Sequence, residues 1–305
     1  MTGLRGTVKH AVERVLVAGG PATIARHSRT RDVLILGYHN IAPAGERPCG
    51  DRSLHLPQAA FAAQLDALLD THDVVPLDAL LGTRAGSDAA ARPRAAITFD
   101  DAYLGALTVG VAELARRDIP ATVFVAPDFI GGRSFWWDAL ADAEAGLAPE
   151  TRERALVEAR GIDACVRTMI RTSAAELPAW ARCATEHDFD AALATSRITL
   201  ASHTWSHPNL TQLTDAELAT ELARPREWLV RYGDRALPVI SYPYGLADAR
   251  VQRAAREAGY RAGFMITGGW TSPPIGERYD VPRLNIPAGL SREGFVLRAA
   301  GILAN

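Results

Sequence analysis

Two short stretches of the chain carry side chains whose types and spacing suit metal-assisted hydrolysis. Asp100 and Asp101 are adjacent in ITFDDAY, and His203 and His207 stand four residues apart in SHTWSHPNL. One carboxylate and two imidazoles form the ligand set of a catalytic zinc site, which keeps a further position open for water. If Asp101, His203 and His207 bind the ion, Asp100 remains as a general base that takes a proton from that water.

Each stretch also has a simpler interpretation when it is taken alone. The two aspartates could cap the N-terminus of a helix, where the helix dipole stabilises negative charge. The two histidines could be structural residues of a turn. A zincin site does not fit, because Thr204 stands where HExxH requires glutamate and Pro208 disfavours helical geometry at His207. The metal interpretation therefore depends on the two stretches meeting in space.

A third stretch, ISYPYG at residues 240–245, also follows a predicted strand. Pro243 and Gly245 indicate a tight loop, and such a loop can present a backbone N–H to an oxyanion. A plain β-turn is the alternative interpretation of this stretch.

The elements around these stretches alternate between short apolar runs and amphipathic helices. Helical spacing of apolar residues marks FAAQLDALLD, VGVAELARRD, TDAELATELARPREWL and ARVQRAAREAGY. Thr214 and Glu217 form a predicted capping box, and Gly259 is a predicted C′ glycine. The predicted strands are residues 33–38, 74–77, 96–99, 121–126, 198–201, 239–241, 263–266 and 283–286. This alternation predicts parallel strands with crossover helices, and so an open α/β sheet or a barrel that gathers the three stretches on one rim.

Two segments depart from the alternation. Residues 138–195 are rich in Ala, Arg and Glu and are predicted to form a helical insertion after the fourth strand, not a separate domain. Residues 82–94 are predicted to be a polar surface connection. We therefore expect a single α/β domain over residues 31–305, preceded by a distinct segment of residues 1–30.

The N-terminal segment, residues 1–30, is basic and has apolar residues at helical spacing. Residues 1–32 hold six basic and two acidic residues, so they carry +4 and the remainder of the chain carries −6. We expect a helix that packs against the barrel through Val8, Val12 and Val15. Weak association with an anionic membrane surface is the alternative.

Composition limits the classes of function. The chain has 305 residues, 48% of them hydrophobic, which is enough for a sizeable core. A formal net charge of −2 provides no electrostatic footprint for nucleic acid, so no nucleic-acid partner is expected. The three cysteines form no CxxC pair, which argues against a disulfide framework and fits the cytoplasm. Secretion is a weaker alternative, because glycines and a proline interrupt the apolar run at residues 15–25.

Taken together, TFDDAY, SHTWSHPNL and YPYG resemble the motifs of the polysaccharide deacetylase family, the NodB-homology domain. The resemblance covers roughly residues 31–290. It implies a distorted (β/α) barrel with seven strands and an Asp–His–His metal site, usually zinc, although the same ligands suit Co²⁺. Members of the family hydrolyse the N-acetyl group of amino sugars or related amides.

The resemblance also implies roles for individual residues. Asp100 matches the catalytic base of the family, and the backbone N–H of Tyr244 matches its oxyanion donor. Asp101, His203 and His207 match its metal ligands.

The chain departs from the family pattern in two places. Ser241 stands where the family often has an arginine that orients the base, and we expect Arg283 to replace that arginine. No histidine follows His207, so the usual C-terminal general acid is absent. The pair Tyr38–His39 resembles the N-terminal Tyr-His of a circularly permuted subset, the poly-N-acetylglucosamine deacetylases, and we assign the general acid to His39.

The expected reaction is metal-dependent deacetylation of an N-acetylated amino sugar, in a glycan or glycoconjugate, with a metal-bound water as nucleophile. The alternatives are a deformylase or other amidohydrolase that acts on a lipid-linked or small-molecule amino sugar, and a non-catalytic carbohydrate-binding protein of the same fold. Trp137 in FWWDAL could stack on a sugar ring, although core packing explains it equally well. Pro243 and Trp205, inside the third and second stretches, are further candidates for substrate contact.

Overall fold

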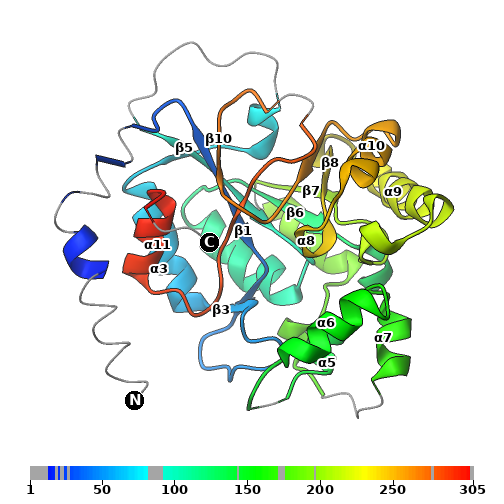
Figure 1. Cartoon of the computed structure of the whole chain (residues 1–305). Coiled ribbons are helices and arrows are strands. Elements are labelled where there is room, and N and C mark those ends of the chain that lie inside the picture. Colours follow the sequence, from blue (N-terminus) through cyan, green and yellow to red (C-terminus); the bar gives the residue numbers. More distant parts are fainter. Residues whose placement is uncertain are drawn as a thin grey trace.

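The computed structural model describes residues 13–17, 20, 24, 25, 28–81, 92–142, 144–170, 176–195, 197–275 and 278–302. Its strands are β1 (Val33–Tyr38), β2 (Asn40–Ala42), β3 (His55–Pro57), β4 (Asp73–Val74), β5 (Arg94–Phe99), β6 (Ala121–Val125), β7 (Ile198–Ser202), β8 (Ala236–Ser241), β9 (Ala262–Phe264), β10 (Trp270–Thr271) and β11 (Leu284–Asn285). Its main helices are α3 (Gln58–Leu69), α4 (Val111–Ala115), α5 (Trp136–Ala139), α6 (Pro149–Val157), α7 (Asp163–Met169), α8 (Glu186–Thr195), α9 (Asp215–Leu229), α10 (Ala249–Glu257) and α11 (Arg292–Ala299). The strands occupy the middle of the molecule, with α9 and α10 on one side and α3 and α11 on the other (Figure 1).

Nine of the described strands form one curled sheet, in the order β10-β1-β5-β6-β7-β8-β9, with β11 also on β1 and β4 also on β5. The pairs within this sheet are parallel except β1 with β10. Val281 bridges to Phe264 of β9, and Leu284 pairs with Leu36 of β1. The run of residues 281–285 therefore connects the two ends of the curl. The predicted α/β fold of the distorted (β/α) barrel type is confirmed.

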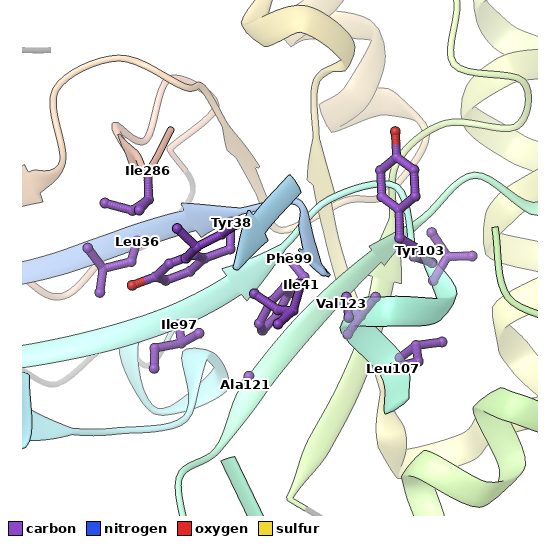
Figure 2. Packing of buried hydrophobic residues seen from close by; sticks show 14 of the residues in the cluster. Leu36, Tyr38, Ile41, Ile97, Phe99, Tyr103, Leu107, Ala121, Val123 and Ile286 are labelled. Atoms are coloured by element: carbon purple, nitrogen blue, oxygen red, sulfur yellow. The ribbon is translucent and has the colours of Figure 1, made fainter. Parts of the chain in front are cut away.

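Alternate residues of the central strands belong to two apolar clusters on the two faces of the sheet. One cluster packs against α3 and α11 and contains, from β1, β5 and β6, Leu36, Tyr38, Ile97, Phe99 and Val123 (Figure 2). The other fills the inside of the curl and contains Val33, Ile35, Ala96, Phe124, Ala201 and Val239. Burial on both faces explains why strands such as VLILGY are continuous apolar runs.

Helix ends follow the local signals in the sequence. The Thr214 side chain accepts from the Glu217 N–H and the Glu217 side chain accepts from the Thr214 N–H, so the predicted capping box starts α9. At the end of α10, Gly259 has a φ of 84°. Its N–H donates to the Arg256 carbonyl, and the Tyr260 N–H donates to the Ala255 carbonyl. This pair of bonds is a Schellman motif, and it confirms Gly259 as the C′ residue.

Between β6 and β7 the described residues form α5, α6, α7 and α8, and no strand beyond isolated bridges. α5, α6 and α7 lie together at one edge of the molecule (Figure 1). α8 packs against β7, which is the place of an ordinary crossover helix. The added part is therefore α5 to α7. It begins at Trp136, slightly before the predicted boundary at residue 138.

The described part of the N-terminal segment lies against the last helix. Residues 13–17 form a helical turn, and Leu16 and Val17 pack on Leu297 and Ala300 at the end of α11. The apolar side of this turn is therefore covered by the body of the protein.

The sequence predicts that Val8, Val12 and Val15 make the contact between the N-terminal segment and the barrel. Val15 is 69% exposed, so the prediction that it packs against the barrel is wrong, and Val8 and Val12 lie outside the described residues. Among the helices that the structure describes, none has the length and apolarity to cross a membrane. Association with a membrane surface stays a prediction.

Candidate active site

The side chains of the predicted site continue the inward-facing positions of their strands. Each stands an even number of residues after an inward-facing apolar residue, and side chains alternate along a strand. They are His39 after β1, Asp100 after β5, His203 after β7 and Ser241 at the end of β8. The chain thus directs these four groups toward the inside of the curl. There, a cavity of about 370 Å³ is lined by His39, Asp100, Asp101, His203, His207 and Tyr244, among others.

The three predicted metal ligands converge. The Nε2 atoms of His203 and His207 lie 3.1 Å apart. Asp101 Oδ1 lies 3.6 Å from the first and 3.4 Å from the second. All three side chains are buried. Bonds of about 2.0–2.1 Å in a tetrahedral zinc site place neighbouring ligand atoms about 3.3 Å apart, so the spacing fits a divalent ion.

The electrostatics of the three ligands also fit an ion. Asp101 Oδ1 is buried and has no hydrogen-bond partner among the residues that the structure describes. Burial, together with the charge of Asp100, raises the pKa of Asp101 well above its usual value. Burial lowers the pKa of His203 and lowers that of His207 further, so both imidazoles are neutral. One unpaired carboxylate oxygen and two neutral ring nitrogens face each other, and a divalent cation would satisfy all three.

His203 is held in one orientation by a partner behind it. Its Nδ1 lies 2.8 Å from the Ser241 carbonyl oxygen and can donate only if the ring proton sits on Nδ1. That tautomer leaves the lone pair of Nε2 directed toward Asp101 and His207. A hydrogen bond of this kind is the usual device that orients a metal-ligating histidine.

The turn that carries His207 has an uncommon backbone. Thr204 has a φ of 66° and His207 a φ of 56°, in the left-handed region that is rare for a β-branched residue. The N–H groups of Trp205 and Ser206 donate to Glu221 of α9 at 2.9 and 2.8 Å. The turn is thus held in place by a helix carboxylate that the motif itself does not contain.

Asp100 has a complete set of partners from the chain. Arg283 is fully buried and donates through Nη1 to Oδ1 and through Nη2 to Oδ2, both at 2.8 Å. The guanidinium also donates to the Thr98 and Ser241 hydroxyls and to the Met265 carbonyl. Burial raises the pKa of Asp100, but the Arg283 guanidinium, together with His203 and His39, outweighs burial and holds that pKa well below its usual range. Asp100 is therefore ionised and fixed in orientation, and Arg283 occupies the expected place beside it.

His39 faces the same cavity. Burial lowers its pKa to about 4, although the nearby charge of Asp100 acts in the opposite direction. His39 is therefore neutral near pH 7 in the free protein.

Tyr244 lies at the third position of a four-residue turn. The Gly245 N–H donates to the Tyr242 carbonyl at 3.0 Å, and Tyr244 has a φ of 59°. A type II turn requires a positive φ at this position, and its own hydrogen bond does not use the N–H of that residue. The turn fits the predicted presentation of the Tyr244 N–H at the cavity that Tyr244 and Gly245 line.

The three predicted substrate contacts have different surroundings. Trp137 is almost fully buried yet lines the cavity, and its ring centre lies 4.8 Å from that of His207. Pro243 is buried inside the turn and is not among the described residues that line the cavity. Trp205 is also absent from that lining, and the Arg224 guanidinium lies 3.7 Å over its ring. The structure therefore supports only Trp137 as a wall of the site.

Part of the cavity wall was not anticipated from the sequence. It consists of Ser53, Leu54, Arg152, Leu156, Ile266 and Asn285, with Gly245 of the third stretch. Arg152 of α6 forms an ion pair with the buried Asp51. Arg152 and Leu156 are four residues apart on one helix face, and this spacing was the one available signal.

Comparison with known proteins identifies the family and the fold. The family model for polysaccharide deacetylase matches residues 87–263, a range that contains all three motif stretches. No curated protein sequence matches the chain.

Solved structures of low sequence identity share the fold. The Streptococcus pyogenes deacetylase PplD in complex with acetate has a TM-score of 0.59 at 18% identity, over 88% of this chain and 98% of that one. IcaB from Ammonifex degensii has a TM-score of 0.60 at 17% identity, over 90% and 98%. A de-N-acetylase from Aggregatibacter actinomycetemcomitans has a TM-score of 0.61 at 14% identity, over 85% and 97%. With its family model matched over more than half of its length, the chain belongs to the polysaccharide deacetylase family.

Proposed function

We propose that this protein is a metal-dependent deacetylase that hydrolyses the acetamide of an N-acetylated amino sugar, in a glycan or glycoconjugate. The observation that supports this most strongly is the convergence of Asp101, His203 and His207, with an unpartnered carboxylate oxygen, on a cavity where Asp100 is held ready beside them. A protein that only bound carbohydrate would have no use for such a set.

Asp101, His203 and His207 would hold the divalent ion, Zn²⁺ or Co²⁺, which would polarise the amide carbonyl and lower the pKa of the attacking water. Asp100 accepts the proton that this water loses. The Tyr244 N–H stabilises the negative charge that develops on the amide oxygen. Trp137 supplies an apolar wall for the sugar ring.

A single proton passes through the site in this scheme. His39 begins neutral, because burial lowers its pKa to about 4. Asp100 does not retain a proton, because Arg283 holds its pKa low. The proton lost by water therefore moves through Asp100 to His39, and His39 delivers it to the leaving nitrogen as the C–N bond breaks. A free amine and acetic acid result, the acid then loses its proton to solvent as acetate, and His39 acts as the general acid.

The test is an assay of acetate and formate release from a panel of N-acetyl and N-formyl amino sugars, as monomers, oligomers and lipid-linked forms, with metal content measured on the same sample. We expect acetate release and about one ion per chain. Release of formate alone would favour the deformylase alternative. A metal-loaded protein that releases neither acid would contradict the proposal.

His203→Ala should lose both the ion and the activity, because it removes one of three ligands. His187 is an exposed histidine of α8, and His187→Ala is the matched control. If His203→Ala keeps the wild-type metal content, the assignment of the metal site is wrong.

A further inference from the structure

A further buried carboxylate, Asp138 of α5, lies outside the cavity wall and is not used by the proposed reaction. It is fully buried. Its Oδ1 accepts from the Asp51 N–H at 2.8 Å and lies 2.9 Å from His55 Nε2. Its Oδ2 accepts from the Tyr103 hydroxyl. One carboxylate thus ties the added helix α5 to the loop before β3 and to the loop that follows β5.

The hydrogen bonds around Asp138 are mutually consistent. Asn40 Nδ2 can only donate, and it lies 2.9 Å from His55 Nδ1. His55 Nδ1 is therefore the acceptor and Nε2 carries the proton that is donated to Asp138. Asn40 Nδ2 also donates to the Trp180 carbonyl at 3.1 Å. A network in which each member has a partner is rigid and admits one arrangement.

One arm of the network reaches the metal site. The Tyr103 hydroxyl, which donates to Asp138, also accepts from Trp137 Nε1 at 2.9 Å. This bond fixes the plane of the indole, and the Trp137 ring packs against His207 and lines the cavity. The orientation of Trp137 therefore depends on Asp138 through Tyr103.

The other arm reaches the opposite wall of the cavity. Asp138 holds the backbone N–H of Asp51. Asp51 Oδ1 in turn accepts from the N–H and the hydroxyl of Ser53, at 3.2 and 2.7 Å. Ser53 and Leu54 line the cavity. The loop that forms this wall is thus anchored at the same carboxylate.

We infer that Asp138 is a positioning residue for substrate: it holds Trp137 on one side of the cavity and Ser53–Leu54 on the other at the separation that an N-acetyl amino sugar requires. The inference rests on the proposed function of the cavity. Packing alone does not explain the residue, because an apolar side chain of similar size would avoid the cost of burying a charge.

Three variants separate the arm that runs through Tyr103 to Trp137 from the arm that runs through Asp51 to Ser53–Leu54. Tyr103→Phe removes the hydroxyl between Asp138 and Trp137 and leaves the Asp51 arm intact. Asp138→Leu releases both arms with a side chain of similar volume. Tyr279→Phe is the matched control, because its hydroxyl donates to the Tyr260 carbonyl at 2.7 Å in a different apolar cluster.

We expect wild-type metal content in all three variants. The KM for the best N-acetyl sugar of the panel should rise about 10-fold in Tyr103→Phe and further in Asp138→Leu, with kcat changed about 2-fold or less, because binding to the walls is shared by ground and transition states. Tyr279→Phe should lower the melting temperature without changing KM. Unchanged KM in Tyr103→Phe, or loss of its metal, would overturn the inference.

Hydrogen–deuterium exchange of the metal-loaded protein tests the same inference without turnover. Exchange should increase at residues 136–139 in Tyr103→Phe, at 136–139 and 51–54 in Asp138→Leu, and at neither segment in Tyr279→Phe. If wild type hydrolyses no sugar, the proposed function fails, and exchange still decides whether Asp138 positions the two walls. Equal exchange at residues 136–139 and 51–54 in wild type and Asp138→Leu would overturn the inference that Asp138 positions the two walls. Should Asp138→Leu not fold, Tyr103→Phe against Tyr279→Phe remains decisive.

Discussion

The surroundings of Asp100 and of Asp101 differ, although the two residues are adjacent and equally buried. Around Asp100, Arg283 pairs with both carboxylate oxygens and keeps the pKa low. Around Asp101, no described residue forms a hydrogen bond with Oδ1, and burial and the charge of Asp100 raise the pKa of Asp101. The described residues supply the countercharge for one carboxylate and none for the other, which is the one to which we propose that the ion binds.

The backbone produces this difference. Asp100 continues the inward-facing register of β5, toward Thr98 and Arg283. Asp101 has a φ of 69°, so the chain turns there and its side chain faces His203 and His207 instead. An unpaired buried carboxylate and a left-handed residue both cost free energy. Their coincidence at one position supports the proposal that a metal ion binds there.

The largest expected effect comes from removing the charge of each aspartate in turn. Asp101→Asn should lose most of the bound metal and with it the activity, because one anionic ligand is gone. Asp100→Asn should keep the metal and lower kcat on the order of 10²–10⁴-fold, because a proton acceptor is lost. Metal analysis and steady-state kinetics on the same preparations measure both effects.

The two variants act as controls for each other. If Asp100→Asn loses its metal, Asp100 is itself a ligand, and the contrast between the paired and the unpaired carboxylate does not correspond to a division of roles.

The next effect concerns the proton that passes from Asp100 to His39. His39→Gln should keep the metal and lower kcat on the order of 10²-fold. The double variant Asp100→Asn/His39→Gln should be no more than a few-fold slower than Asp100→Asn alone, because both residues act on the same proton. If the single-turnover rate of the double variant falls by the product of the two single-variant factors, His39 and Asp100 handle separate protons.

Part of the difference between the surroundings of Asp100 and Asp101 could be predicted from the sequence. Apolar runs that end in Asp100 and His203 predict strand ends on one rim, and the period of two along a strand explains why both face inward. The candidate metal ligands could be named from residue type, the spacing of the two histidines and the expectation that both strand ends lie on one rim.

The supporting contacts were less accessible, because they join residues far apart in the chain. Arg283 lies 183 residues from Asp100, and only a resemblance to a family pattern suggested the pair. Asp138 lies 87 residues from Asp51, and no spacing indicates their contact. Trp205 has the residue type of a sugar contact, but its ring packs under Arg224 of α9. Tertiary packing decides these contacts.

A smaller effect is expected from Arg283→Lys. This variant keeps a positive charge beside Asp100 but loses the guanidinium that contacts both carboxylate oxygens. Lysine at position 283 cannot contact both oxygens of Asp100 at once. The pKa of Asp100 should therefore rise in Arg283→Lys. Asp100 stays ionised near pH 7, but it is no longer held at both oxygens, so kcat/KM should fall about 10-fold. Metal content should stay at the wild-type level, because Arg283→Lys leaves the proposed ligands Asp101, His203 and His207 in place. An unchanged kcat/KM would mean that the two-point contact with Arg283 does not position Asp100 for the reaction.

The smallest effect is expected from Ser241, which occupies the place where the family often has an arginine. Its hydroxyl accepts from Arg283 Nη2 at 2.6 Å and donates to Asp100 Oδ2 at 3.3 Å. Ser241→Ala removes both bonds, but each Asp100 oxygen keeps its bond to Arg283. We expect kcat/KM to fall by less than about 10-fold and the free energy of unfolding to fall by about 1–3 kcal/mol, because two buried hydrogen bonds of about 0.5–1.5 kcal/mol each are lost. The Ser241 carbonyl that orients His203 belongs to the backbone, so metal content should be unchanged. A loss of kcat/KM comparable to that of Asp100→Asn would show instead that Arg283 alone does not hold Asp100 and that the Ser241 hydroxyl is also needed.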